Sequence, residues 1–503
     1  MLSIPHDIIN ELIKILKISD ALHFISTCKT WQNICIYHLD DSRVTDDILQ
    51  RPIFYNIKYL NISNNNINNI SHLIHLTKLN ISHNKNIYQI SILTALTILK
   101  ASDCVLNNID NLINLKNLNI CYNNNITNIS YLTALTKLNA SRWVHNNIDN
   151  LINLKNLNIS SNKNITNISH LTTLTKLNAS DCALNNINNL INLKNLNISY
   201  NKNITNISYL TALTILDVSG SICAVNNINN LNNLTLLDIY YNKNITNIAH
   251  LTTLTKLNAS DCALNNINNL INLKNLNISY NKNITNISYL TALTILNVSG
   301  STCAVNNINN LNNLTLLKIC YNKNITNISH LTTLKKLYAR GTTCALNNTN
   351  NLINLTMLNI SYNKNITTIS HLTALRKLSA SGETCAFNNT DNLINLTELH
   401  IFNNKNITTI SYLSALTILI ATGVECALNN VDNLINLTDL NICNNKNIRN
   451  ISKLSALTKL NASGDECALN NVDNLINLTD LDISFNQNIN TVSHLTNLLH
   501  LKS

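Results

Sequence analysis

The chain has 503 residues, of which 45% are hydrophobic but only 5% aromatic, and it contains 6 Gly and 2 Pro. Loops of ordinary globular domains need more turn-forming residues, so this composition excludes a string of conventional domains and favours one motif copied many times. The formal net charge is +10, but charged residues make up only 12% of the chain and no basic run occurs, which argues against a nucleic-acid partner.

The N-terminus and the apolar segments bear on localisation. No stretch of about 18 uninterrupted apolar residues occurs, so we expect no membrane-spanning helix and no membrane partner. Near the N-terminus, acidic residues and lysines stand among the apolar ones, whereas a secretory signal needs a continuous apolar stretch. The sequence therefore predicts an intracellular, cytoplasmic protein.

Residues 1–45 are predicted to form a small all-α head. Between residues 7 and 16, isoleucines and leucines recur at helical spacing, and Ser19 is a suitable N-cap for a second helix. Trp31 falls in a third predicted helix. A head of this kind could simply cover the first edge of a repeat structure.

The order of residues in this head resembles an F-box. Residues 4–34 contain an Ile-Pro start, a D-I-I-x-E-L segment, an L-x-x-x-D-x-L step and a C-K-x-W-x-x-I ending, with Ile4 and Thr27 departing from the family's usual Leu and Val. The resemblance implies that the head docks on the small adaptor subunit of a cullin–RING ubiquitin ligase. The residues expected to contact that adaptor occupy matching positions: Pro5, Ile8, Ile9, Leu12, Leu16, Leu22 and Trp31.

Residues 46–56 are predicted to be a linker or N-terminal cap, and residues 57–503 are tandem repeats. The pattern L-x-x-L-x-[I/A/V]-x-x-[N/C], followed by I-x-x-[I/L]-x-x-L, recurs at spacings of 19 to 21 residues, giving 22 repeats and a terminal fragment at Leu498. This pattern resembles the leucine-rich repeat. Proteins of this appearance are similar to F-box and repeat proteins of giant DNA viruses, which would place this one in a host cytoplasm.

The spacing within one repeat predicts the fold. In the copy that starts at Leu193, Leu196 and Ile198 alternate and so share one face of a strand, whereas beyond Asn201 the apolar period becomes three. A period of three suits a 3₁₀-like or extended back, and about 20 residues leave no room for a long helix. We therefore expect an α/β solenoid, a right-handed leucine-rich-repeat superhelix with a parallel concave sheet and a 3₁₀ or extended convex back.

Cysteine replaces the conserved Asn in most odd repeats, and those repeats mostly have Ala in place of the inner Ile, so the repeating unit is a pair of coils. Cysteines two coils apart would lie roughly 9–10 Å apart at about 4.8 Å per strand, whereas a disulfide needs a Cα separation of about 4.4–6.8 Å. We expect buried free thiols and a reducing compartment. From the ninth repeat, most cysteine coils gain two residues, where we expect small bulges.

The sequence predicts no enzyme, no cofactor and no metal site. It has no P-loop, no Gly-rich dinucleotide loop, no H-E-x-x-H and no C-x-x-C, and its histidines are scattered. Many N-x-S/T triplets occur, as at Asn203. An extracellular glycoprotein would explain them, but a motif built of Asn, Ile, Ser and Thr also produces them by composition, and we favour the second explanation.

Departures from the repeat's own consensus indicate where a protein target binds, because the framework does not require them. One departure interrupts the fifth repeat, where Trp143 takes a Cys position. The others are aromatic and Arg residues, which are typical interface anchors. The predicted target-binding residues are Tyr240, Tyr241, Tyr338, Arg340, His400 and Phe402. Drift among tandem copies is the alternative explanation.

We interpret the chain as a protein-interaction receptor, the substrate-recognition subunit of an SCF-type cullin–RING ubiquitin ligase. The main alternative is a repeat scaffold or host-interaction protein whose head only caps the solenoid. A surface adhesin resembling bacterial internalins is a third possibility, which free cysteines disfavour.

Overall fold

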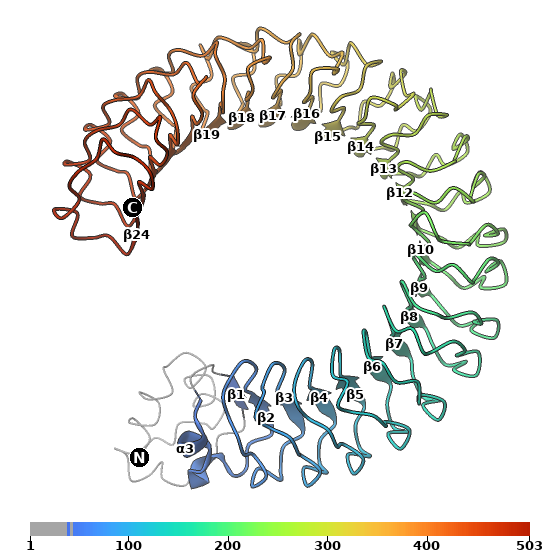
Figure 1. Ribbon diagram of the computed structural model, residues 1–503. Coiled ribbons are helices and arrows are strands. Elements are labelled where there is room, and N and C mark those ends of the chain that lie inside the picture. The colour runs from blue at the N-terminus through green and yellow to red at the C-terminus, as the bar shows by residue number, and fades with distance from the viewer. Residues whose placement is uncertain (1–37, 41–43) are drawn as a thin grey trace, which may run out of the picture. The chain divides into compact units, whose positions relative to one another are not determined.

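The computed structural model describes residues 38–40 and 44–503 (Figure 1). The predicted all-α head and all seven predicted adaptor contacts therefore fall outside the described residues, apart from the end of the head. That end holds a strand that the sequence did not predict, β1 (His38–Asp40), which pairs in parallel with β2 (Tyr59–Asn61). The predicted linker contains a short helix, α3 (Asp46–Leu49), and a 3₁₀ turn, η2 (Pro52–Phe54).

The carboxylate of Asp46, at the start of α3, joins this junction to the first repeat. It accepts hydrogen bonds from the Asn68 backbone (3.0 Å) and side chain (2.6 Å) and from the Asn69 backbone (3.3 Å). Burial opposes ionisation, but the hydrogen bonds outweigh it and lower the pKa of Asp46 below its ordinary value.

The chain divides into two compact units, Met1–Ile245 and Thr246–Ser503, and each is a parallel solenoid. The first unit contains β1, β2, β3 (Lys78–Asn80), β4 (Ile98–Lys100), β5 (Asn117–Asn119), β6 (Lys137–Asn139), β7 (Asn156–Asn158), β8 (Lys176–Asn178), β9 (Asn195–Asn197), β10 (Ile215–Asp217) and β11 (Leu236–Asp238). The second contains β12 (Lys256–Asn258), β13 (Asn275–Asn277), β14 (Ile295–Asn297), β15 (Leu316–Lys318), β16 (Lys336–Tyr338), β17 (Met357–Asn359), β18 (Lys377–Ser379), β19 (Glu398–His400), β20 (Ile418–Ile420), β21 (Asp439–Asn441), β22 (Lys459–Asn461), β23 (Asp480–Asp482) and β24 (His500–Lys502).

Every described strand is three residues long, and within each unit the central leucines of neighbouring strands pair, as Leu196 does with Leu216 and Leu276 with Leu296. These central leucines are buried, with the exception of Leu501 at the last strand. The two flanking residues lie on the other face, which within each unit is the inner, concave side of the curve (Figure 1). The predicted parallel concave sheet is confirmed.

The back of each coil is a run of three-residue turns, as the apolar period predicted. In the coil of β9, the amide of Leu210 donates to the carbonyl of Ile207 (3.0 Å) and that of Leu213 to Leu210 (3.1 Å). These residues are buried, and residues 57–503, all of which are described, contain no helix. Each coil places its apolar residues on two opposite sides, so the core forms only when coils stack.

The Asn that follows the strand in even repeats fastens one coil to the previous one. Asn201 is fully buried; its side-chain amide donates to the carbonyl of Leu184 (2.9 Å), and its oxygen accepts from the amides of Asn203 and Ile204, each at 2.9 Å. A buried turn backbone would otherwise leave these groups without partners.

The cysteines of the odd coils are buried and free, as predicted. The thiol of Cys182, for example, donates to the carbonyl of Ala179 at 2.9 Å. Burial raises the pKa of the Cys303 and Cys344 thiols to about 11. These groups therefore stay protonated at neutral pH and act as small apolar side chains.

The two residues inserted before most later cysteines widen the turn, and a glycine makes this possible. Gly382 has φ +97°, and a Cβ there would lie 2.4 Å from the Tyr362 ring of the preceding coil. Trp143 shows that not every departure from the consensus lies on the surface. It occupies the Cys position of the fifth repeat and is fully buried, and its indole donates to the carbonyl of Ile126 (2.7 Å).

Candidate binding surface

The first and last residues of each strand make up the concave surface, because they flank a leucine that points into the core. In β9 the flanking Asn195 and Asn197 are half-buried while Leu196 is buried. The residue two positions after the strand lies at the edge of this surface. The residue that ends a strand often accepts a backbone bond, as Asn197 does from the Ser199 amide (2.9 Å). Side chains that differ from coil to coil at the surface positions can serve recognition.

The predicted target-binding residues occupy these positions with one exception. Tyr338 and His400 end β16 and β19, and Arg340 and Phe402 lie two residues beyond those strands. At about 4.8 Å per strand, three strands separate the two pairs by about 14 Å, so they form a row and not one cluster.

The other two residues belong to the first unit. Tyr240 lies two positions after β11 and is 43% exposed, and Tyr241 lies in the turn beyond it, with φ 58°. Their ring centroids are 5.9 Å apart. All six residues are exposed or half-buried, in contrast to Trp143.

Around β16, aromatic and cationic side chains contact one another. The Tyr338 hydroxyl donates to the sulfur of Met357 (3.1 Å), and the Lys318 ammonium lies 5.3 Å from the Tyr338 ring centroid. The Arg340 guanidinium lies 5.7 Å from the Tyr362 ring centroid. Such cation–π contacts hold the side chains in place ahead of any partner.

At β18 and β19, charged side chains of the concave surface pair with one another. The Glu398 carboxylate accepts from the Lys377 ammonium at 2.5 Å and lies 3.2 Å from the His400 ring. His400 therefore has a partner within the protein, which sequence analysis did not anticipate.

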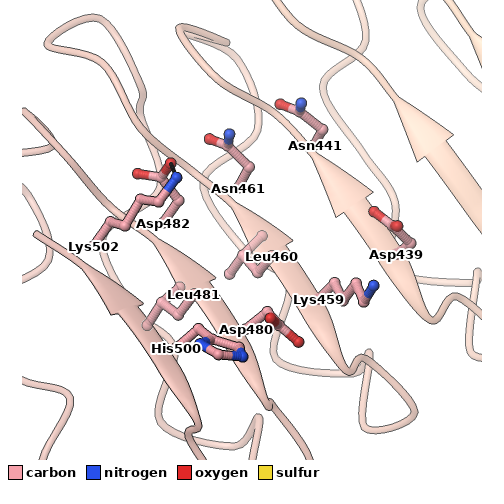
Figure 2. A pocket seen from close by; sticks show the side chains of 10 residues that line it. All are labelled: Asp439, Asn441, Lys459, Leu460, Asn461, Asp480, Leu481, Asp482, His500 and Lys502. Carbon is pink, nitrogen blue, oxygen red and sulfur yellow. Dashed lines mark ion pairs between the residues drawn. The ribbon is translucent and has the colours of Figure 1, made fainter. Parts of the chain in front are cut away.

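The last four strands of the second unit form a shallow pocket of about 230 Å³ on the concave surface (Figure 2). Its residues are Asp439, Asn441, Lys459, Leu460, Asn461, Asp480, Leu481, Asp482, His500 and Lys502. The lining contains three carboxylates, two lysines and a histidine. The Lys502 ammonium lies 4.0 Å from the Asp482 carboxylate. The pocket thus has little net charge. Sequence analysis missed it, although charged residues at the strand positions of the last repeats were a usable signal.

The first unit has a pocket of about 340 Å³ across β5–β8, and its chemistry differs. Apart from two leucines, its lining is made only of amides and ammonium groups: Asn117, Asn139, Asn156, Asn158, Asn178, Lys137 and Lys176. No carboxylate offsets the two lysines. This pocket, like the other, opens on the concave surface.

Within the described part of the chain, no group of three or more His, Cys, Asp or Glu residues could hold a metal ion, and no helix is long and apolar enough to cross a membrane. The pockets on both concave surfaces are lined mainly by polar side chains.

The F-box domain model matches residues 1–39. No curated protein matches the sequence. Among solved structures, a TLR13–ssRNA13 complex is 20% identical with a TM-score of 0.49, covering 85% of this chain and 69% of that one. Plant peptide hormone receptor RGFR1 in complex with RGF2 is 19% identical (TM-score 0.41; coverage 85% and 90%), and a leucine-rich-repeat protein of Leptospira interrogans is 21% identical (TM-score 0.37; coverage 77% and 88%).

The repeat pattern and the parallel solenoid that it forms define a leucine-rich-repeat protein. The F-box domain match lies directly before this solenoid.

Proposed function

We propose that this chain is the substrate-recognition subunit of an SCF-type cullin–RING ubiquitin ligase in the cytoplasm. In this role the F-box domain recruits the small adaptor subunit, and the concave surfaces bind a protein target. The observation that carries the proposal is the F-box match at residues 1–39, followed directly by a solenoid with exposed, variable concave positions.

The adaptor would contact the apolar residues of the head that fall on the family's positions. We expect Leu12→Asp and Leu16→Asp to abolish binding, because a charged carboxylate cannot be buried in an apolar interface without a partner. A matched control is Ile113→Asp, since Ile113 is apolar and 58% exposed but lies in the solenoid.

The test is co-expression of the full chain with the adaptor subunit, followed by affinity capture and size-exclusion chromatography. The parent chain and the Ile113→Asp variant should co-elute with the adaptor, and the two head variants should not. If the parent chain does not bind the adaptor, the ligase role is wrong and the alternative of a repeat scaffold with a capping head replaces it.

The target is proposed to contact the aromatic and cationic residues identified above. Replacing Tyr240, Tyr338, Arg340 and Phe402 by Ala should weaken capture of the proteins that co-purify with the parent chain, because large aromatic and Arg side chains contribute most of the energy at interfaces. Retention of the same partners by this variant would overturn the assignment of these residues.

A further inference from the structure

The concave surface of the first unit and the residues just before its strands carry a row of lysines. From β2 to β9, each coil has one lysine, located either on the strand or immediately before it. We call these eight residues the lysine row: Lys58, Lys78, Lys100, Lys116, Lys137, Lys155, Lys176 and Lys194.

The lysine row has no acidic counterpart on its own surface. All eight side chains are exposed, and none of their ammonium groups makes an ion pair or hydrogen bond within the described residues. At the same strand positions of β2–β9 there is no Asp or Glu; the first ones are Asp40 on β1 and Asp217 on β10, at either end of the row.

Two other lysines of the same unit do have carboxylate partners. Lys85 and Lys163 follow the strands, in the turns, and contact Asp103 at 2.8 Å and Asp181 at 2.6 Å. These two turn lysines thus have a carboxylate beside them, whereas the lysines along β2–β9 do not.

The spacing of the row matches an extended polypeptide. From β5 to β9 the lysines form two columns, one before the strands (Lys116, Lys155, Lys194) and one on the strands (Lys137, Lys176). Within a column they are two coils apart, about 9.6 Å at about 4.8 Å per strand. A polyproline II chain rises about 3.1 Å per residue with three residues per turn, so every third side chain returns to the same side after about 9.3 Å.

We propose that this surface binds an extended acidic protein segment with a carboxylate at every third residue, lying along the solenoid over the two columns. Carboxylates would pair with ammonium groups, and the neighbouring Asn amides of the β5–β8 pocket would donate to the segment's backbone carbonyls. The proposal deepens the function above by naming the chemistry of the target, and it rests on that function only in taking the solenoid as the recognising part.

The observations favour an acidic polypeptide over a single-stranded nucleic acid. Non-specific binding of single strands uses aromatic side chains on which bases stack, together with Arg. From β3 to β9 the strand positions and the residues before them contain no aromatic residue and no Arg. The surface offers charge and amides, which suit carboxylates and peptide groups.

The test measures binding of a fluorescent peptide of repeated Glu-Pro-Pro triplets to the full chain by anisotropy. The variant combines Lys116→Gln, Lys137→Gln, Lys155→Gln and Lys176→Gln. The control removes the same charge from exposed turn lysines, with Lys202→Gln, Lys282→Gln, Lys323→Gln and Lys364→Gln.

We expect the variant to bind about 30-fold more weakly and the control to stay within about twofold of the parent. Four exposed ion pairs at about 0.5 kcal/mol each sum to about 2 kcal/mol, which is that fold-change. Binding of the parent should also weaken with added salt. A peptide with the same composition but with its Glu residues in one block should bind more weakly than the triplet peptide.

Three results would overturn the proposal: equal losses in the variant and the control, equal binding of the block and triplet peptides, or tighter binding of an oligouridine of the same charge. Adaptor capture separates this proposal from the ligase role. Adaptor binding without peptide binding refutes only the acidic-segment site, and peptide binding by a chain that fails to capture the adaptor supports the site while refuting the ligase role.

Discussion

The buried Asn that follows the strand in even repeats gives the sharpest prediction about stability. In the second unit Asn445 is fully buried; its side-chain amide donates to the Ala421 carbonyl (2.8 Å), and its oxygen accepts from the Asn447 (2.9 Å) and Ile448 (3.0 Å) amides. Asn445→Ala removes all three bonds at once. Each is worth about 1 kcal/mol net, so the coil should lose about 3 kcal/mol of local stability.

The loss should be local, because each coil of a solenoid contacts only its neighbours. Native-state hydrogen exchange measures it directly: a loss of about 3 kcal/mol corresponds to exchange faster by on the order of 100-fold at amides of this coil. The matched control is Asn450→Ala in the same coil, where an exposed Asn accepts a single bond from the Ser452 amide (2.9 Å). The control should cost less than about 1 kcal/mol. If the amides of this coil exchange at the same rate in both variants, the buried Asn does not hold neighbouring coils together.

The remaining predictions concern a glycine, a thiol and a carboxylate. Gly382→Ala should destabilise the second unit by about 1–3 kcal/mol in urea unfolding, because it adds a Cβ at positive φ against the Tyr362 ring, and Tyr362→Ala should recover part of the loss. Burial raises the pKa of Cys426 to about 11, so alkylation of the folded protein, followed by mass spectrometry, should label half-buried Cys443 first at pH 8. The same shift stabilises the fold below pH 9.0, and this contribution should be lost as the pH rises toward about 11. The lowered pKa of Asp46 contributes stability above pH 3.8 that is lost as the pH falls below it, so Asp46→Asn should weaken the acid sensitivity of hydrogen exchange at the first repeat.

The sequence predicted the solenoid well because its two periods are local. Alternation around Leu196 and the three-residue spacing from Ile204 onward each fix which side chains are buried, and stacking then leaves one arrangement. The two-coil unit and the free thiols followed from the same alignment of copies.

The binding surface was less predictable, because exposure depends on neighbouring coils. Trp143 departs from the consensus as Tyr338 does, yet Trp143 is buried and bonds to the Ile126 carbonyl of the preceding coil, whereas Tyr338 stays half-buried on the surface. The pairing of His400 with Glu398 arises within one strand, but its link to Lys377 joins residues 21 apart in the sequence, and single-residue departures do not reveal such links.

The alternation of Asn and Cys also sets the step by which this protein can change length. Two successive coils can both have Asn at this position. Asn84 donates to the carbonyls of Asn65 (2.8 Å) and Ile67 (3.0 Å) in the preceding coil. Excision of one asparagine coil from a later part of the chain would instead bring two thiols to about 4.8 Å, inside the separation at which sulfurs can be oxidised to a cross-link. Gain or loss of coils in pairs keeps the thiols two coils apart. We therefore expect duplications and deletions in this chain to comprise a whole pair of coils.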